Sequence, residues 1–286
     1  MRIAGAPISW GVCEVPGWGY QLTPDRVLKE MAEVGITATE FGPDGFLPDD
    51  PQEKAATLAS YGLKAVGGFV PVVLHDPGHD PVPEVDKALD SFVAAGGDVL
   101  VLAANSGLEG YDTRPVLDET GWATMFANLD RLAELARSRG ITPSLHPHVG
   151  TMVESRDDVM RVLNGSSIPL CLDTGHMLIG GTDPVEVVEQ WTDRIAHVHA
   201  KDVTKALVAK VRSGELTYQQ AVAQNIYVPL GQGDVDFETI VAKLTEAGFD
   251  GWYVMEQDTI LAEAPSDEGP LGAVRASIAY LKGLAA

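Results

Sequence analysis

Cysteine is scarce in this chain of 286 residues, which contains only Cys13 and Cys171. Two cysteines cannot form a disulfide framework, and we expect both to be small buried residues rather than redox partners. No uninterrupted apolar run is long enough to span a bilayer, and the chain opens without the apolar run of a signal peptide. These absences favour a cytoplasmic protein that makes no membrane contact.

Basic residues are also few. The chain has 20 lysines and arginines against 41 acidic residues, which gives a formal net charge of −21. Proteins that bind nucleic acid need a basic footprint to neutralise phosphates, so we expect no nucleic-acid partner. The acidic balance itself is sufficiently explained by solubility.

The chain does contain a regular alternation of strand-like and helix-like segments. Strand-like apolar runs are expected at 3–9, 37–41, 64–70, 99–103, 142–146, 170–173, 195–199 and 252–256. Helical spacing of apolar residues is expected at 24–34, 51–61, 82–95, 121–139, 157–163, 184–191, 237–247 and 273–284. Eight such units predict an α/β fold, a (β/α)8 TIM barrel that forms a single domain over residues 1–286. A doubly wound open sheet usually has fewer units, and no GxGxxG motif follows the first strand.

Residues 203–230 interrupt this alternation between the seventh strand and its helix. The segment contains a helical pattern of apolar residues, and its position places it in a βα loop on the catalytic face of the barrel. The residues alone leave two interpretations open. In the first, the insertion is functional, as a lid or as a wall shared with a neighbouring subunit. In the second, it is a surface decoration.

Five residues that can bind a metal or act on a substrate fall at the carboxyl ends of expected strands: Glu40, His146, Asp173, His199 and Glu256. Working residues of barrel enzymes occupy these ends. Each residue alone also has a structural explanation, such as a buried histidine or a salt bridge. The joint placement of the last four on strands five to eight predicts a metal site. Carboxylates with imidazoles suit Mn²⁺, Co²⁺, Zn²⁺ or Fe²⁺ better than Mg²⁺, which prefers oxygen ligands.

Strand parity places His197, His199 and Lys201 on one face of the seventh strand. His199 near the tip suits a metal, and His197 one step deeper suits a hydrogen-bonded core histidine. A lysine beside a metal can have a lowered pKa and act as a base or acid, so Lys201 is a catalytic candidate. A salt bridge from Lys201 to an acidic neighbour, such as Asp202, is the alternative.

Short motifs at 173–176 (Asp-Thr-Gly-His), 199–202 (His-Ala-Lys-Asp) and 255–256 (Met-Glu) resemble the metal motifs of the xylose isomerase-like barrel superfamily. That superfamily includes sugar isomerases, epimerases, dehydratases and a DNA-repair endonuclease. The closer resemblance is to its inosose dehydratases (2-keto-myo-inositol dehydratases), through residues 6–10, 146–151 and the run from 197 to 233. The insertion is part of that resemblance, which favours the lid interpretation.

The resemblance implies a carbon–oxygen lyase that uses one divalent ion, Mn²⁺ or Co²⁺ first, with Zn²⁺, Fe²⁺ and Mg²⁺ as alternatives. It also implies a small polyhydroxy ketone as substrate, and we expect a homo-oligomer, a dimer or tetramer. A proton would leave the carbon beside the ketone, and the metal would stabilise the resulting enediolate. Loss of water would then complete a dehydration of the inosose. Return of the proton would instead make the protein an isomerase or epimerase. The metal motif does not distinguish between these reactions.

The superfamily usually has glutamate as its ligand on the fifth strand, where this chain has His146. Whether His146 or His148 binds the metal is open, with His146 favoured as ligand. We expect Lys201 and His148 to supply the base and the acid, with Glu40 as a third catalytic candidate. Further substrate contacts are expected from residues beyond the strand ends and in the loops: Trp10, stacking on the ring, with His75, Asn105, Glu154, His176 and Arg212.

Two classes of function other than this chemistry remain as alternatives. A non-catalytic sugar-binding barrel would bind no metal. A nuclease with several metals would need a histidine pair before the Pro-Leu-Gly segment, where this chain has 225–228, Asn-Ile-Tyr-Val. The acidic charge and this missing pair count against the nuclease.

Overall fold

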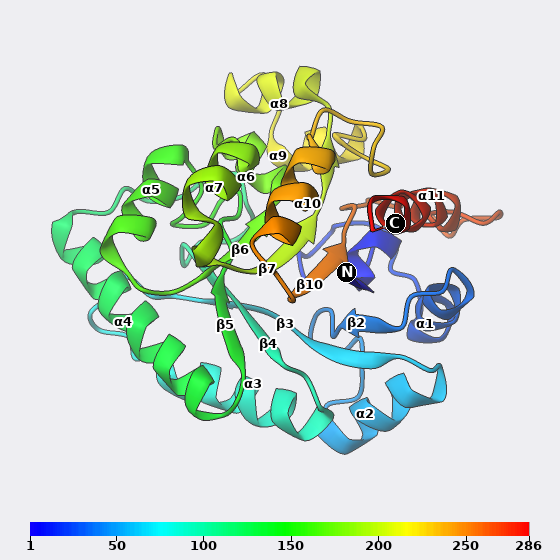
Figure 1. Cartoon of the computed structure of the whole chain (residues 1–286), viewed down its shortest axis with the longest axis horizontal. Coiled ribbons are helices and arrows are strands. Elements are labelled where there is room, and N and C mark those ends of the chain that lie inside the picture. The colour runs from blue at the N-terminus through cyan, green and yellow to red at the C-terminus, as the bar shows by residue number, and fades with distance from the viewer. Residues whose placement is uncertain (286) are drawn as a thin grey trace.

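The computed structural model describes residues 1–285 and shows a closed parallel barrel (Figure 1). Its strands hydrogen-bond in the order β1-β10-β7-β6-β5-β4-β3-β2, and every neighbouring pair is parallel. The barrel strands are β1 (Arg2–Gly5), β2 (Ala38–Glu40), β3 (Lys64–Val72), β4 (Val99–Ala104), β5 (Thr142–Leu145), β6 (Leu170–Asp173), β7 (Ile195–Ala200) and β10 (Trp252–Met255). The predicted TIM barrel is therefore confirmed.

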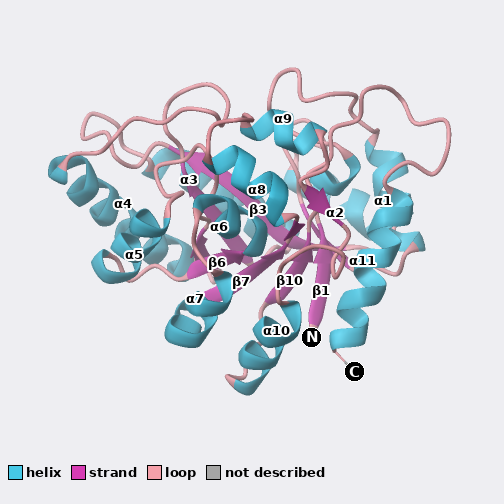
Figure 2. Cartoon of the chain, turned by 90° about the horizontal axis from the view of Figure 1, so that it is seen from above, coloured by secondary structure: helices cyan, strands magenta, loops and turns pink. Residues whose placement is uncertain are grey.

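Helices surround the barrel and cover the outward faces of the strands (Figures 1 and 2). They are α1 (Pro24–Glu33), α2 (Pro51–Ser60), α3 (Val82–Ala95), α4 (Glu119–Ser138), α5 (Arg156–Gly165), α7 (Pro184–Trp191), α10 (Phe237–Glu246) and α11 (Leu271–Leu284). Local sequence explains several helix starts, since Asp50 accepts hydrogen bonds from the backbone of Gln52 and Glu53 at the start of α2. Within residues 1–285, no helix combines the length and the apolar character needed to cross a bilayer.

Two local departures from the sequence expectation shape the site end of the barrel. The first strand ends at Gly5, and Pro7–Trp10 forms a 3-10 helix, because Pro7 has no N–H to donate to a strand ladder. A short helix, α6 (Thr174–Gly180), follows β6 without a loop. The Asp173 side chain accepts a hydrogen bond from the backbone of His176 and so caps this helix, 2.7 Å away.

The insertion folds as two short helices and a small antiparallel sheet. The helices are α8 (Lys205–Arg212) and α9 (Tyr218–Ala223), and the sheet pairs β8 (Asp202–Val203) with β9 (Tyr227–Val228). The Thr217 side chain and Gln220 form a reciprocal capping box at the start of α9. Figure 2 shows α9 among the loops at the end of the barrel opposite the N-terminus.

Asp202 anchors the base of this insertion. Its buried carboxylate accepts hydrogen bonds from the backbone N–H groups of Val203, Gly231, Gly233 and Val235, at 2.8–3.1 Å. Asp202 is therefore not the acidic neighbour that pairs with Lys201, because it serves the backbone of the loop that leaves the insertion.

Substitution of Asp202 by alanine should lower the free energy of unfolding by about 3 kcal/mol, because it leaves buried N–H groups without an acceptor. Chemical denaturation with urea measures this loss. Asp236 is a matched control, because it caps α10 at an exposed position, and its replacement by alanine should cost only about 1 kcal/mol. Equal losses for the two variants would contradict the anchoring role.

Candidate active site

A cavity of about 1010 Å³ opens at the carboxyl ends of the barrel strands. Polar and aromatic side chains from almost every strand end reach it. Those with functional chemistry are Glu14, Glu40, Tyr111, His146, His148, His199, Lys201, Tyr218, Glu256 and Asp258. The structure therefore brings the predicted metal and catalytic residues to one place, although they are up to 216 residues apart in the sequence.

Three of these side chains, His146, His199 and Glu256, converge with the buried Asp173 as a metal site would require. Ligand atoms of Asp173, His199 and Glu256 lie within 4.8 Å of one another, and all three residues are buried. The Nδ1 atom of His199 is 3.2 Å from Oε2 of Glu256 and 3.6 Å from Oδ2 of Asp173. The Nε2 atom of His146 is 3.2 Å from the same Asp173 oxygen.

The hydrogen bonds of the two histidines direct their free nitrogens to this point. Nδ1 of His146 lies 2.8 Å from the carbonyl oxygen of Pro147, and a carbonyl only accepts, so this nitrogen carries the proton. Nε2 of His199 lies 3.0 Å from Oε1 of Glu40 and donates to it in the same way. The opposite nitrogens, Nε2 of His146 and Nδ1 of His199, then face the carboxylate of Asp173. Burial disfavours a charged His199, but Cys171, Glu256 and Glu40 raise its pKa well above the usual value, so a bound cation would take the place of a proton on Nδ1.

Two atoms of this group, Oδ2 of Asp173 and Nδ1 of His199, are buried without a hydrogen-bond partner among residues 1–285. Buried polar atoms are normally satisfied, so such orphans need an explanation. A divalent ion coordinated by His146, Asp173, His199 and Glu256 explains both. The donor set of two imidazoles and two carboxylates fits Mn²⁺, Co²⁺, Fe²⁺ or Zn²⁺.

Glu40 lies behind the candidate metal ligands and hydrogen-bonds to one of them, His199. Its Oε1 accepts hydrogen bonds from His197 at 2.9 Å and from His199 at 3.0 Å. Burial favours the neutral form of this carboxyl, but the charge of His199 and the two hydrogen bonds hold its pKa well below the usual range. Sequence placed Glu40 across the barrel as a catalytic or hydroxyl-binding group. In the structure Glu40 instead orients His199, a candidate ligand, through a hydrogen bond. His197 is the buried, hydrogen-bonded histidine that parity predicts.

Lys201 lies among three carboxylates. Its Nζ is 2.8 Å from Asp258, 3.1 Å from Glu256 and 3.5 Å from Asp173. Burial lowers the pKa of a lysine, but the charges of Asp173, Asp258 and Glu256 outweigh it and raise the pKa of Lys201 well above its usual value. The predicted lowering of this pKa is therefore wrong, and the alternative of a salt bridge from Lys201 to acidic neighbours is confirmed. Lys201 is an ammonium group in this environment.

The same neighbours determine the state of the carboxyl groups. Burial alone would raise the pKa of Asp173, but Lys201 and His176 lower it well below its usual value. Burial likewise opposes ionisation of Glu256, and the charges of His199 and Lys201 lower its pKa. Both ligand carboxyls are thus ready to bind a cation without first losing a proton.

His148 occupies a different environment from His146. Its Nδ1 lies 2.7 Å from the carbonyl oxygen of Val149, and its ring lies on that of His176 with 3.7 Å between centroids. Burial, followed by the charges of His146 and Lys201, lowers the pKa of His148 well below its usual value. The imidazole is therefore neutral and lines the cavity with its Nε2 lone pair free, as a general base requires.

Several site residues escaped the sequence reasoning. Asp258 binds Lys201 and accepts a hydrogen bond from the Tyr218 hydroxyl at 2.6 Å, and Tyr227 lies 3.1 Å from that hydroxyl. A signal for Asp258 was its spacing of two residues from Glu256, which keeps the side chain on one face. The tyrosines come from the insertion, where a helical apolar pattern says nothing about which residues turn inward.

The structure does not bring Trp10 to the cavity. Its indole is fully buried, and Nε1 donates a hydrogen bond to Glu30 at 2.8 Å. The 3-10 turn that replaces the end of the first strand rotates this side chain into the core against α1. Trp18 lines the cavity instead.

Five other expected substrate contacts lie outside the cavity lining. Asn105 closes its own loop by accepting a hydrogen bond from the backbone of Gly107, and Glu154 accepts one from the backbone of Gly150. Arg212 is an exposed residue at the end of α8. His75 is half-buried, and His176 lies behind His148 rather than on the cavity surface.

Comparison with known proteins agrees with this fold. A family model described as xylose isomerase-like TIM barrel matches residues 28–284. The inosose dehydratase of Geobacillus kaustophilus is 33% identical over 272 residues, covering 90% of this chain and 87% of that protein. Among solved structures, the IOLI protein with a bound zinc atom superposes with a TM-score of 0.71 at 14% identity, covering 99% of this chain and 98% of that one.

An L-ribulose 3-epimerase superposes nearly as well, with a TM-score of 0.70 at 16% identity, covering 99% of this chain and 94% of that one. Both superpositions show a shared fold. The chain belongs to the xylose isomerase-like TIM barrel family, as the motifs in its sequence predict.

Replacement of Glu40 by glutamine should weaken Mn²⁺ binding about 10- to 100-fold, because the partner that orients His199 loses its charge. Titration followed by the Mn²⁺ electron paramagnetic resonance signal measures the affinity. Glu14 is the matched control, since this cavity carboxylate contacts Tyr111 and none of the proposed ligands, so Glu14→Gln should bind Mn²⁺ normally. Unaltered affinity in Glu40→Gln would contradict the orienting role.

Proposed function

We propose that this protein is a metal-dependent lyase that removes water from a keto-inositol, an inosose. The observation that carries the proposal is the convergence of His146, Asp173, His199 and Glu256, with Lys201 and neutral His148 beside them. Similarity to an inosose dehydratase over 90% of this chain supports the substrate class. A small polyhydroxy ketone fits a cavity lined by both carboxylates and aromatic rings.

The residues divide the reaction between them. A divalent ion held by the four ligands supplies a Lewis acid that stabilises the negative charge developing on the substrate oxygen. His148 takes the proton from the carbon beside the ketone, because its imidazole is neutral and lines the cavity. Lys201 is charged and adjoins the ligand Glu256, so it donates a proton to the departing hydroxyl.

Epimerisation is the alternative, because its first step is the same proton removal and the fold is shared with an L-ribulose 3-epimerase. Incubation of the protein with Mn²⁺ or Co²⁺ and scyllo-inosose separates the two. We expect a product lighter by one water molecule, measured by mass spectrometry, and no product after removal of the ion with a chelator. Conversion at unchanged mass would overturn the dehydratase assignment in favour of an epimerase or isomerase.

The two histidines of the fifth strand should separate in function. His148→Gln should lower kcat by about 10²- to 10⁴-fold, because a general base is lost, while Mn²⁺ affinity remains. His146→Gln should instead lose Mn²⁺ affinity, because Nε2 of this residue faces Asp173. Steady-state kinetics and Mn²⁺ titration of both variants test this division, and loss of metal binding in His148→Gln alone would reverse it.

A further inference from the structure

Cys171 lies beneath the proposed metal site. It precedes Asp173 by two residues on β6, so the two side chains point to the same side of the strand. The Cys171 side chain is fully buried in the inner core of the barrel, among small residues such as Ala4 and Val254. This position fits a small structural residue, but its polar neighbours are unusual for that role.

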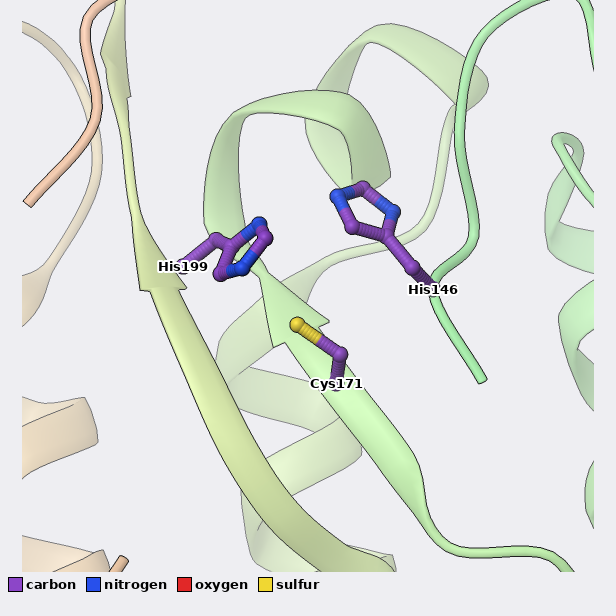
Figure 3. Close-up of side chains that lie close together, drawn as sticks. All are labelled: His146, Cys171 and His199. Atoms are coloured by element: carbon purple, nitrogen blue, oxygen red, sulfur yellow. The ribbon is translucent and has the colours of Figure 1, made fainter. Parts of the chain in front are cut away.

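Those neighbours are His146 and His199. Each of these three side chains offers one ligand atom, and the three atoms of His146, Cys171 and His199 lie within 4.8 Å of one another. All three residues are buried. The two imidazole rings are 4.8 Å apart between centroids and nearly perpendicular. Figure 3 shows the Cys171 sulfur below the two imidazole rings, with each side chain coming from a different segment.

We propose that His146, Cys171 and His199 form a second coordination set that binds soft divalent ions such as Cd²⁺ and Zn²⁺. Thiolate sulfur prefers such ions, whereas carboxylate oxygen suits Mn²⁺ and Mg²⁺. Imidazole binds both kinds, so it can belong to both sets. The chain thus holds an oxygen-rich set that includes Asp173 and Glu256, and a sulfur-containing set below it.

An ion can reach the deeper set through the cavity, because His146 and His199 line it. Zinc–sulfur and zinc–nitrogen bonds are about 2.0–2.3 Å long, so modest side-chain rotations bring the three atoms around one ion. As the sulfur–metal bond forms, the thiol proton is released to solvent.

The two sets share both histidines and therefore hold one ion at a time. A soft ion in the lower set removes His146 and His199 from Asp173 and Glu256, so it excludes Mn²⁺. Inhibition of Mn²⁺-supported turnover by Cd²⁺ would follow, and this consequence rests on the proposed function. The coordination itself does not, because metal binding is measured without substrate.

Titration of the metal-free full-length protein with Cd²⁺ tests the proposal through the thiolate-to-cadmium charge-transfer absorbance in the ultraviolet. We expect a band that saturates at one ion per chain. Cys171→Ser and Cys171→Ala should both lose this band. Cys13→Ser is the control and should retain it, because Cys13, the other cysteine, lies at the cavity surface and outside the proposed set. Absence of the band in the unmodified protein, or its survival in both Cys171 variants, would overturn the proposal.

A reciprocal variant separates the two sets. Asp173→Asn keeps an acceptor for the helix cap of α6 but removes a charged oxygen ligand, so it should lose Mn²⁺ binding and keep the cadmium band. Saturating Mn²⁺ should suppress the band in the unmodified protein, because the histidines are shared. Independent binding of Mn²⁺ and Cd²⁺ to the same chain would show that the sets are not shared. Failure of the dehydratase assay with a normal cadmium band would reject the proposed function alone.

Discussion

The buried charge at the carboxyl end of the barrel is the constraint on which the site depends. Asp173, Glu256 and Asp258 are all buried around a single ammonium group, that of Lys201. Charges taken out of water are costly unless they are paired, so each of these groups must be held by the others. One lysine does not balance three carboxylates and Glu40 behind them, and a divalent ion reduces the excess negative charge.

The barrel provides the rigid positions that this arrangement requires. Register pairs Asp173 on β6 with His199 on β7, and His199 with Val254 on β10, so the carboxyl ends of neighbouring strands are aligned. Alternation along each strand then directs every second side chain inward. Glu40 on β2 reaches His199 from the other side of the barrel and fixes which nitrogen faces the site.

The insertion contributes side chains to the site. Tyr218 on α9 lines the cavity and binds Asp258, which in turn binds Lys201. The surface-decoration interpretation therefore does not describe this segment, whose side chains reach the proposed catalytic lysine. Asp202, next to Lys201 in the chain, holds the loop that leaves the insertion through hydrogen bonds from its backbone. Because Lys201 and Asp202 are consecutive residues, the proposed catalytic lysine lies next to the residue that anchors the insertion.

Where prediction from sequence was accurate, the physical rule was local or periodic. Strand ends followed from apolar runs, and the inward face of β7 followed from alternation around His199. Trp10 was misplaced because a 3-10 turn changes the side-chain direction without changing the apolar pattern. The pKa of Lys201 was predicted with the wrong sign, because burial and neighbouring charge act in opposite directions and only distances decide between them.

The sequence by itself determined the barrel, the residues at its carboxyl ends and the resemblance to a metal-dependent family, because repetition and motif spacing are carried along the chain. Only the tertiary structure decided which nitrogen of each histidine is free, that Glu40 supports His199, and that Asp258 and Tyr218 reach Lys201. These facts depend on side chains that meet across the barrel from distant segments. Their hydrogen bonds and charges act over a few ångströms, a distance that sequence separation does not encode.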